Sequence, residues 1–176
     1  MSMSKFDLFK DQQARFKIAL KEYDPNVWFP PLRGNFKMDN PGNWFICFVP
    51  TSWGRWKGAT YGIHFGFMYA RPRGDLPERF RLVIGVEAPL KESQRQAFKE
   101  EVISRVRAKG IPLSGFNLQA KARTKLLESD IIPFDNQTWQ ITLKRYIELQ
   151  PLVKIISKVI KMNYEKGAFD LSINFP

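Results

Sequence analysis

Two neighbouring segments in which every second residue is apolar constrain the fold of this chain more than any other feature. In segment 61–70, four large side chains share one face: Ile63, Phe65, Phe67 and Tyr69. Segment 79–87 repeats the pattern with Phe80, Leu82, Ile84 and Val86. A period of two is that of a half-buried strand. The connection, RPRGDLP, carries a glycine and two prolines, as turns do. We therefore predict a β-hairpin.

Four further segments have strand-like patterns. Residues 44–49 form a continuous apolar run that ends at Pro50. In segments 118–125 and 137–144, apolar or small residues alternate with polar ones. The tail alternates as well, and its pattern over 169–173 predicts a short edge strand.

Three segments have the spacing of amphipathic helices. The first covers residues 5–23. The second covers 91–109, with Ser93 as its expected N-cap and basic residues before Gly110 at its end. The last begins near residue 147 or 151 and continues to 166, where a glycine follows.

These elements predict one domain over residues 1–176. Its parts are the N-terminal helix, a long loop over 24–43 that Trp28 and Phe29 anchor, and a sheet-and-helix body over 44–176. Runs of antiparallel strands with interspersed helices are typical of α+β proteins. We expect a mostly antiparallel sheet of about five strands, with helices packed on one face.

Charge gives the clearest indication of a partner. The chain has 28 basic and 17 acidic residues, a net charge of +11. Such an excess favours a polyanion, with nucleic acid first and an acidic membrane surface or acidic protein second. Solubility alone is the competing interpretation. No apolar run approaches the length of a membrane span, and we expect no membrane partner.

The sequence offers little for catalysis. A single cysteine, Cys47, and a single histidine, His64, exclude a Cys/His zinc site within one chain but not a Cys–His pair. A restriction-type nuclease needs an acid two residues before a lysine, whereas Glu87 precedes Lys91 by four. No phosphate-binding loop or hydrolase motif occurs, so we expect neither a cofactor nor a metal. The lone cysteine and the polar N-terminal residues suggest a cytoplasmic location.

Three basic sets are candidate nucleic-acid contacts, and each has solvated surface as its alternative. The first lies on one face of the strand predicted over 118–125: Lys121, Arg123 and Lys125. Such residues are about 6.6–7 Å apart, which suits successive backbone phosphates. The second lies on one side of the last helix: Lys154, Lys158 and Lys161. The third clusters around the hairpin connection: Arg71, Arg73 and Arg79.

A fourth candidate is the stretch TSWGRWKGATYG, over 51–62, where rings and cations interleave. Its candidate residues are Trp53, Arg55, Trp56 and Lys57. Bases stack on aromatic faces while basic side chains hold phosphates. Equally, the two tryptophans could plug the core, with Arg55 and Lys57 covering their edges.

The order of elements resembles a known group of domains. It comprises an N-terminal helix, the aromatic strands NWFICFV and GIHFGF, the strand RLVIGVE, the helix KESQRQAFKEEVISRV, a basic strand and a last helix. This order is similar to that of a small uncharacterised domain fused to restriction-type nucleases in bacteria and archaea. The resemblance implies a restriction-modification or defence-associated module that acts beside nucleic-acid-processing enzymes without a catalytic site of its own.

We therefore expect a nucleic-acid-binding accessory protein of a prokaryotic or phage system. Binding would use a basic sheet and helix surface, with base stacking as a further possibility. Two alternatives stay open: a protein-interaction module with exposed aromatic residues, and a divergent metal-dependent nuclease.

Overall fold

The computed structural model describes residues 4–30, 43–56, 62–75, 77–87, 89–169 and 173–175. Secondary structure occurs there in the order α1 (Lys5–Tyr23), β1 (Asn43–Phe48), η1 (Thr51–Trp53), β2 (Arg55–Trp56), β3 (Ile63–Ala70), β4 (Arg79–Val86), α2 (Glu92–Ala108), β5 (Phe116–Leu118), β6 (Lys125–Ser129), α3 (Thr138–Glu148), α4 (Gln150–Glu165) and β7 (Ile173–Asn174). The segment 31–42, most of the predicted long loop, lies outside the described residues.

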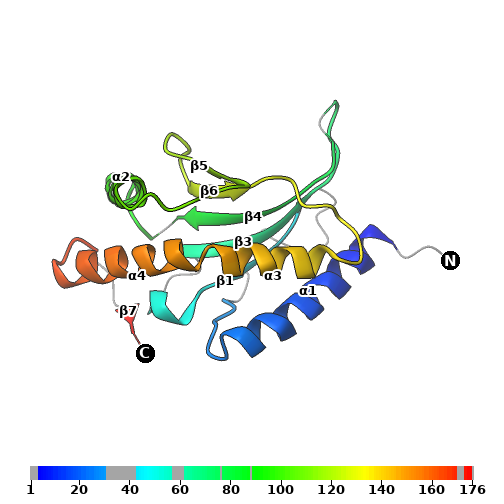
Figure 1. Cartoon of the computed structure of the whole chain (residues 1–176), viewed down its shortest axis with the longest axis horizontal. Coiled ribbons are helices and arrows are strands. Elements are labelled where there is room, and N and C mark those ends of the chain that lie inside the picture. The colour runs from blue at the N-terminus through cyan, green and yellow to red at the C-terminus, as the bar shows by residue number, and fades with distance from the viewer. Residues whose placement is uncertain are drawn as a thin grey trace.

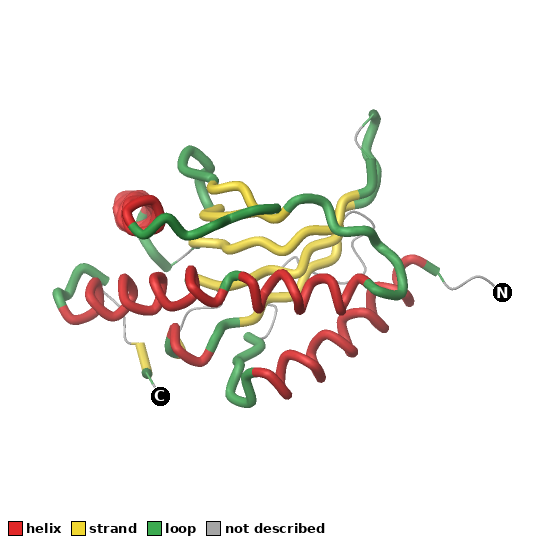
Figure 2. The backbone as a smooth tube through the Cα atoms, viewed as in Figure 1, coloured by secondary structure: helices red, strands yellow, loops and turns green. Residues whose placement is uncertain are grey.

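Five of these strands form one sheet in the order β1-β3-β4-β6-β5, and every neighbouring pair is antiparallel. The predicted hairpin is confirmed, because β3 and β4 pair along their whole length, from Ile63 opposite Val86 to Ala70 opposite Arg79. Helices α1, α3 and α4 lie across one face of the sheet, and α2 lies beside α4 at the ends of the strands (Figures 1 and 2). The α+β class is therefore confirmed.

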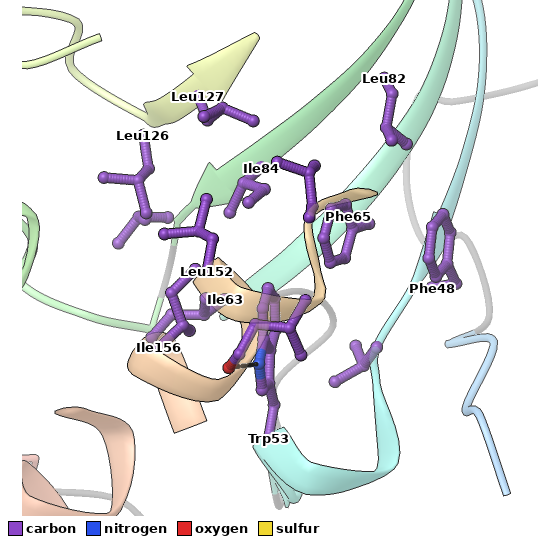
Figure 3. Packing of buried hydrophobic residues seen from close by; sticks show 14 of the residues in the cluster. Phe48, Trp53, Ile63, Phe65, Leu82, Ile84, Leu126, Leu127, Leu152 and Ile156 are labelled. Carbon is purple, nitrogen blue, oxygen red and sulfur yellow. Dashed lines mark hydrogen bonds between the residues drawn. The ribbon is translucent and has the colours of Figure 1, made fainter. Parts of the chain in front are cut away.

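The core lies between the sheet and the helices, because the alternating apolar side chains that the two hairpin strands share, such as Phe65 and Phe67 of β3 and Phe80 and Leu82 of β4, face the helices. Phe65 is at its centre and stacks on Phe48 and on Trp53, with ring centroids 5.1 Å apart in both pairs. From α4, Leu152 and Ile156 reach the same cluster (Figure 3). Burial of these large rings is the main favourable term in folding.

Two helix boundaries show which local signals set them. Helix α2 begins after Lys91, whose backbone N–H donates to Gln94 Oε1 at 2.8 Å. The prediction of Ser93 as the N-cap is therefore wrong, because the side chain of Gln94 satisfies the first backbone donor instead. Gly110, with φ of 59°, follows α2 and adopts the left-handed conformation that favours glycine.

The strand predicted over 118–125 is wrong. Only its two ends are strands, as parts of β5 and β6, and residues between them form a turn. The buried ammonium of Lys99, on α2, donates to the carbonyl of Ala120 at 3.1 Å and to that of Ala122. The alanines offer little apolar area for a strand to bury, so these hydrogen bonds determine the local conformation.

The strand predicted over 137–144 is also wrong, because α3 covers this segment. Thr138, Thr142 and Tyr146 are buried and recur every four residues, which is the helical period. The hydroxyl of Thr138 accepts from the backbone N–H of Asp135 at 2.8 Å and fixes the start of the helix. The apolar residues that alternate along α3 are only half-buried at its sides.

The N-terminal loop and the tail are tied to the body by short strand pairings. Trp28 exchanges two backbone hydrogen bonds with Val49, of 3.0 and 2.8 Å, as expected of an anchor residue. In the tail, β7 pairs with β2 rather than with the main sheet, with Ile173 opposite Trp56. Helix α4 covers the predicted last helix.

Candidate anion-binding site on the open face of the sheet

The face of the sheet that points away from the helices carries basic side chains on its central strands. Since Phe80 and Leu82 of β4 point into the core, Arg79 and Arg81 point to the opposite face. The register places Arg81 opposite Met68 of β3. The sequence therefore positions two arginines side by side on a rigid strand.

A cleft of about 260 Å³ lies over these strands. We call it the sheet cleft; its described lining residues are Met68, Ala70, Arg79, Arg81, Val83, Lys125 and Glu128. Residues of β3, β4 and β6 thus meet in one concave surface. Lys125 comes from the strand that follows the β5–β6 turn, and it reaches the arginines because β6 pairs with β4.

Positive charge exceeds negative charge in the sheet cleft. Its described lining holds Arg79, Arg81 and Lys125 against one carboxylate, Glu128. Glu128 forms an ion pair with Arg81 and another with Lys125, at 2.8 Å. One acid is shared by two cations, so a net positive charge remains for an anion from solution.

Two donors in the sheet cleft have no partner. The Nε atoms of Arg79 and Arg81 are buried and make no hydrogen bond within the described structure. A buried donor without an acceptor costs free energy, about 1–3 kcal/mol. An anion that entered the cleft would supply acceptor oxygens, which is the usual role of arginine in phosphate and carboxylate recognition.

The pKa values of the cleft cations indicate mutual repulsion. Burial lowers the pKa of Arg81 and the positive charge of Arg79 lowers it further, whereas the nearby carboxylate of Asp130 acts in the opposite direction. Burial also lowers the pKa of Lys125, with additional contributions from Arg81 and Arg79. Because desolvation and like charges both disfavour the charged forms of Arg81 and Lys125, a bound anion would stabilise these two cations.

The basic residues predicted from the sequence fall partly around this site. Arg71 and Arg73 are exposed in the connection that leads into β4, and Lys121 and Arg123 are exposed in the turn that leads into β6. The two connections project from opposite ends of the strands (Figure 1). Only Lys125 of the predicted strand face lines the sheet cleft, so that face does not exist as a row of three cations.

The aromatic stretch belongs to the core. Trp53 is fully buried, and its Nε1–H donates to the carbonyl of Val153 at 3.2 Å (Figure 3). Trp56 is 3% exposed and packs against Phe169, with ring centroids 5.6 Å apart. Neither ring has a face open to a base, which corrects the stacking role and favours the core alternative. Arg55 is exposed on β2, and Lys57 lies outside the described residues.

The lysines predicted on the last helix lie away from the sheet cleft. Lys154, Lys158 and Lys161 are exposed on α4, which covers the opposite face of the sheet. Lys161 is 4.0 Å from Glu165. The other two lysines border a separate groove, described below.

Sequence reasoning missed Arg81 and Glu128. The signal for Arg81 was present, because it shares a face with Arg79 in the alternating strand. Glu128 had no such signal, since its place in the sheet cleft depends on the pairing of β6 with β4.

The described residues form neither a metal-binding cluster nor a membrane-spanning helix. No three His, Cys, Asp or Glu side chains there are grouped so as to hold a metal ion. None of the described helices combines the length and apolar character that crossing a membrane requires. Comparisons with protein families, with curated proteins and with solved structures give no match for this chain. The resemblance to the nuclease-associated domain therefore stays a prediction.

Proposed function

We propose that this chain binds nucleic acid and that the sheet cleft holds a backbone phosphate. The composition of the sheet cleft carries the proposal: Arg79, Arg81 and Lys125 meet there against a single carboxylate. The arginine Nε–H groups without partners are donors of the kind that phosphate oxygens accept from. Arginine also keeps its charge when it is partly buried, which suits a recessed anion site.

A polyanion explains the surroundings better than a single small anion does. The exposed Arg71 and Arg73 lie in the connection at one end of the central strands, and the exposed Lys121 and Arg123 lie in the turn at the other end (Figure 1). A small anion would fill only the sheet cleft, whereas successive phosphates of one strand would also meet these residues. The net charge of +11 favours the same partner.

The proposed contacts bind the phosphate backbone of the nucleic acid rather than its bases. The described lining of the sheet cleft contains no aromatic side chain on which a base would stack. Phosphate contacts fix the position of a nucleic acid but carry no sequence information directly. We therefore expect affinity that depends strongly on salt and weakly on sequence, as suits an accessory module of a prokaryotic or phage system.

The test is the double variant Arg79→Gln/Arg81→Gln, titrated against labelled single- and double-stranded DNA and RNA at several salt concentrations. Losing two charged hydrogen-bonding groups should weaken binding about tenfold or more. The slope of log K against log salt should become shallower by about one, because the sheet cleft holds one phosphate and about one counterion is released per phosphate contact. Fluorescence anisotropy measures both quantities.

The matched control is Lys154→Gln/Lys158→Gln, which removes the same charge from the opposite side of the molecule. We expect this control to change affinity by less than about twofold, since exposed charges at a distance are screened. Equal weakening by both double variants would show that net charge alone drives binding. The sheet cleft would then not be the site.

A further inference from the structure

A second concave surface lies on the other side of the molecule, between α4 and the end of α2. Its volume is about 590 Å³, within the range of pockets that bind ligands, about 300–1,000 Å³. We call it the lysine groove; its described lining residues are Ser52, Lys109, Ile111, Pro151, Lys154, Ile155, Ser157 and Lys158. None of these residues belongs to the sheet cleft.

The floor of the lysine groove is aliphatic. We use the word floor for the three aliphatic residues of the lining, Ile111, Pro151 and Ile155; Ile155 is almost fully buried, Ile111 is half-buried and Pro151 is exposed. The hydroxyls of Ser52 and Ser157 lie 2.8 Å apart and hydrogen-bond to each other. These polar groups already have partners, so the floor offers mainly apolar surface to a ligand.

Three exposed lysines also line the groove, and we call them its rim: Lys109, Lys154 and Lys158. Lys154 and Lys158 are one helical turn apart on the same side of α4, about 5–6 Å between their Cβ atoms. Within the described structure none of the three forms an ion pair, and the described lining contains no carboxylate. Positive charge is therefore uncompensated around an apolar floor.

From this combination we infer that the lysine groove docks an acidic, amphipathic segment of a partner protein. Leucine-like side chains of that segment would cover the aliphatic floor, while its Asp and Glu side chains would pair with the lysine rim. Nucleic acid fits less well, because the described lining holds neither an aromatic ring for stacking nor an arginine fork for phosphate. A second copy of this chain would bring a net charge of +11 against the lysines.

The probe is a labelled peptide of glutamates with a few interspersed leucines, compared with a second peptide in which serine replaces each leucine. Both peptides carry the same charge, so the comparison isolates the aliphatic floor. We expect the leucine peptide to bind at least about tenfold more tightly, because burying leucines on the floor contributes roughly 1.5–3 kcal/mol each. Anisotropy at low and at physiological ionic strength measures the affinities of the full chain.

Charge-reversal variants test whether the leucine peptide binds in the lysine groove. Lys154→Glu/Lys158→Glu should weaken the leucine peptide about tenfold or more, because it puts like charges opposite the glutamates. Lys161→Glu/Lys166→Glu makes the same change of charge further along the chain from the groove and should have less than about a twofold effect. Amide chemical-shift changes should centre on Ile111 and Ile155.

Peptide docking in the lysine groove does not rest on nucleic-acid binding in the sheet cleft, and either proposal can be contradicted without the other. Arg79→Gln/Arg81→Gln should leave peptide affinity unchanged. The inference is overturned by equal affinity for the two peptides, by equal loss in the two lysine variants, or by no binding of the leucine peptide. Displacement of that peptide by DNA, with shifts at Ile111 and Ile155, would make nucleic acid the occupant and overturn it as well.

Discussion

At the scale of single residues, Glu128 decides how strongly the sheet cleft attracts an anion. Its carboxylate pairs with both Arg81 and Lys125 and therefore offsets part of their charge. Its side chain is only 15% exposed, so solvent screens these pairs less than it screens pairs on the surface. A bound phosphate would compete with Glu128 for the same donors.

The variant Glu128→Gln follows from this competition. It keeps the shape of the side chain but removes the negative charge, and we expect nucleic acid to bind about threefold to tenfold more tightly at low salt. Loss of two partly buried ion pairs should also lower the free energy of unfolding. Anisotropy and urea denaturation measure the two effects. Weaker binding would mean that Glu128 positions the cations and does not compete with the ligand.

At the scale of elements, the turn between β5 and β6 depends on α2. Lys99 on this helix is buried, and burial lowers its pKa. Its ammonium nevertheless bonds the carbonyls of Ala120 and Ala122, which lie on either side of Lys121. One buried cation thus determines where two exposed cations, Lys121 and Arg123, are presented.

Replacing Lys99 by methionine should uncouple this turn from the helix. Methionine fills similar space but leaves the carbonyls of Ala120 and Ala122 without a donor, which should destabilise the chain by about 1–3 kcal/mol. Urea denaturation measures the loss, and Lys144→Met, at an exposed position on α3, is the control. A free energy of unfolding equal to that of the control would contradict the structural role of Lys99.

The elements also show which parts of the fold can be predicted from sequence periodicity. The hairpin and α1 follow from periodicity within one segment, and both are found with the predicted bounds or nearly so. Segment 137–144 misleads because Trp139, Ile141 and Leu143 alternate, whereas burial follows Thr138, Thr142 and Tyr146. A distant contact adds to the local one at the start of α3: Gln12 Oε1 accepts from the N–H of Trp139 at 3.1 Å.

The candidate site is predictable only in part for the same reason. Arg79 and Arg81 share a face by strand geometry, which the sequence contains. Lys125 and Glu128 join them because β6 pairs beside β4 after α2 and β5 intervene in the chain. Such pairing between distant segments leaves no local periodic signal.

At the scale of the whole molecule, the surplus charge is unevenly distributed. On α1, Lys10 pairs with Asp7 and Arg15 with Asp11, so much of that helix balances its own charge. The sheet cleft and the lysine groove instead hold several cations with one carboxylate or none in their described linings. Part of the net charge of +11 therefore lies on these two surfaces.

The stability of the whole molecule should fall in alkaline solution. Burial raises the pKa of the Cys47 thiol above its ordinary value of 9.0, and burial likewise raises the pKa of Tyr69 and Tyr146 above 10.0. The unfolded chain releases these protons at lower pH than the folded chain does. Unfolding is thus favoured progressively above about pH 9. The contribution of these protonated groups to the free energy of unfolding is complete only below that pH.

A cysteine variant isolates one of these contributions. Between about pH 8 and pH 10 the parent chain should lose about 1.4 kcal/mol more stability than Cys47→Ala, because one pKa unit corresponds to that free energy. Lys99 and Lys125 have lowered pKa values that act in the opposite direction, and both chains share them. Urea denaturation midpoints of both chains at the two pH values give the difference in lost stability. Equal losses in the parent chain and in Cys47→Ala would show that the thiol titrates normally.

The continuous pairing of β3 with β4 makes the same eight residues, Arg79–Val86, both the lining of the core and the support of the arginines. Changing a side chain on one surface leaves the other intact, so ligand preference can drift during evolution with little loss of foldability. Inserting or deleting a single residue exchanges the two surfaces and sends the guanidinium groups into the interior. Homologous chains should therefore vary at positions 79 and 81 by substitution, while strand length stays constant.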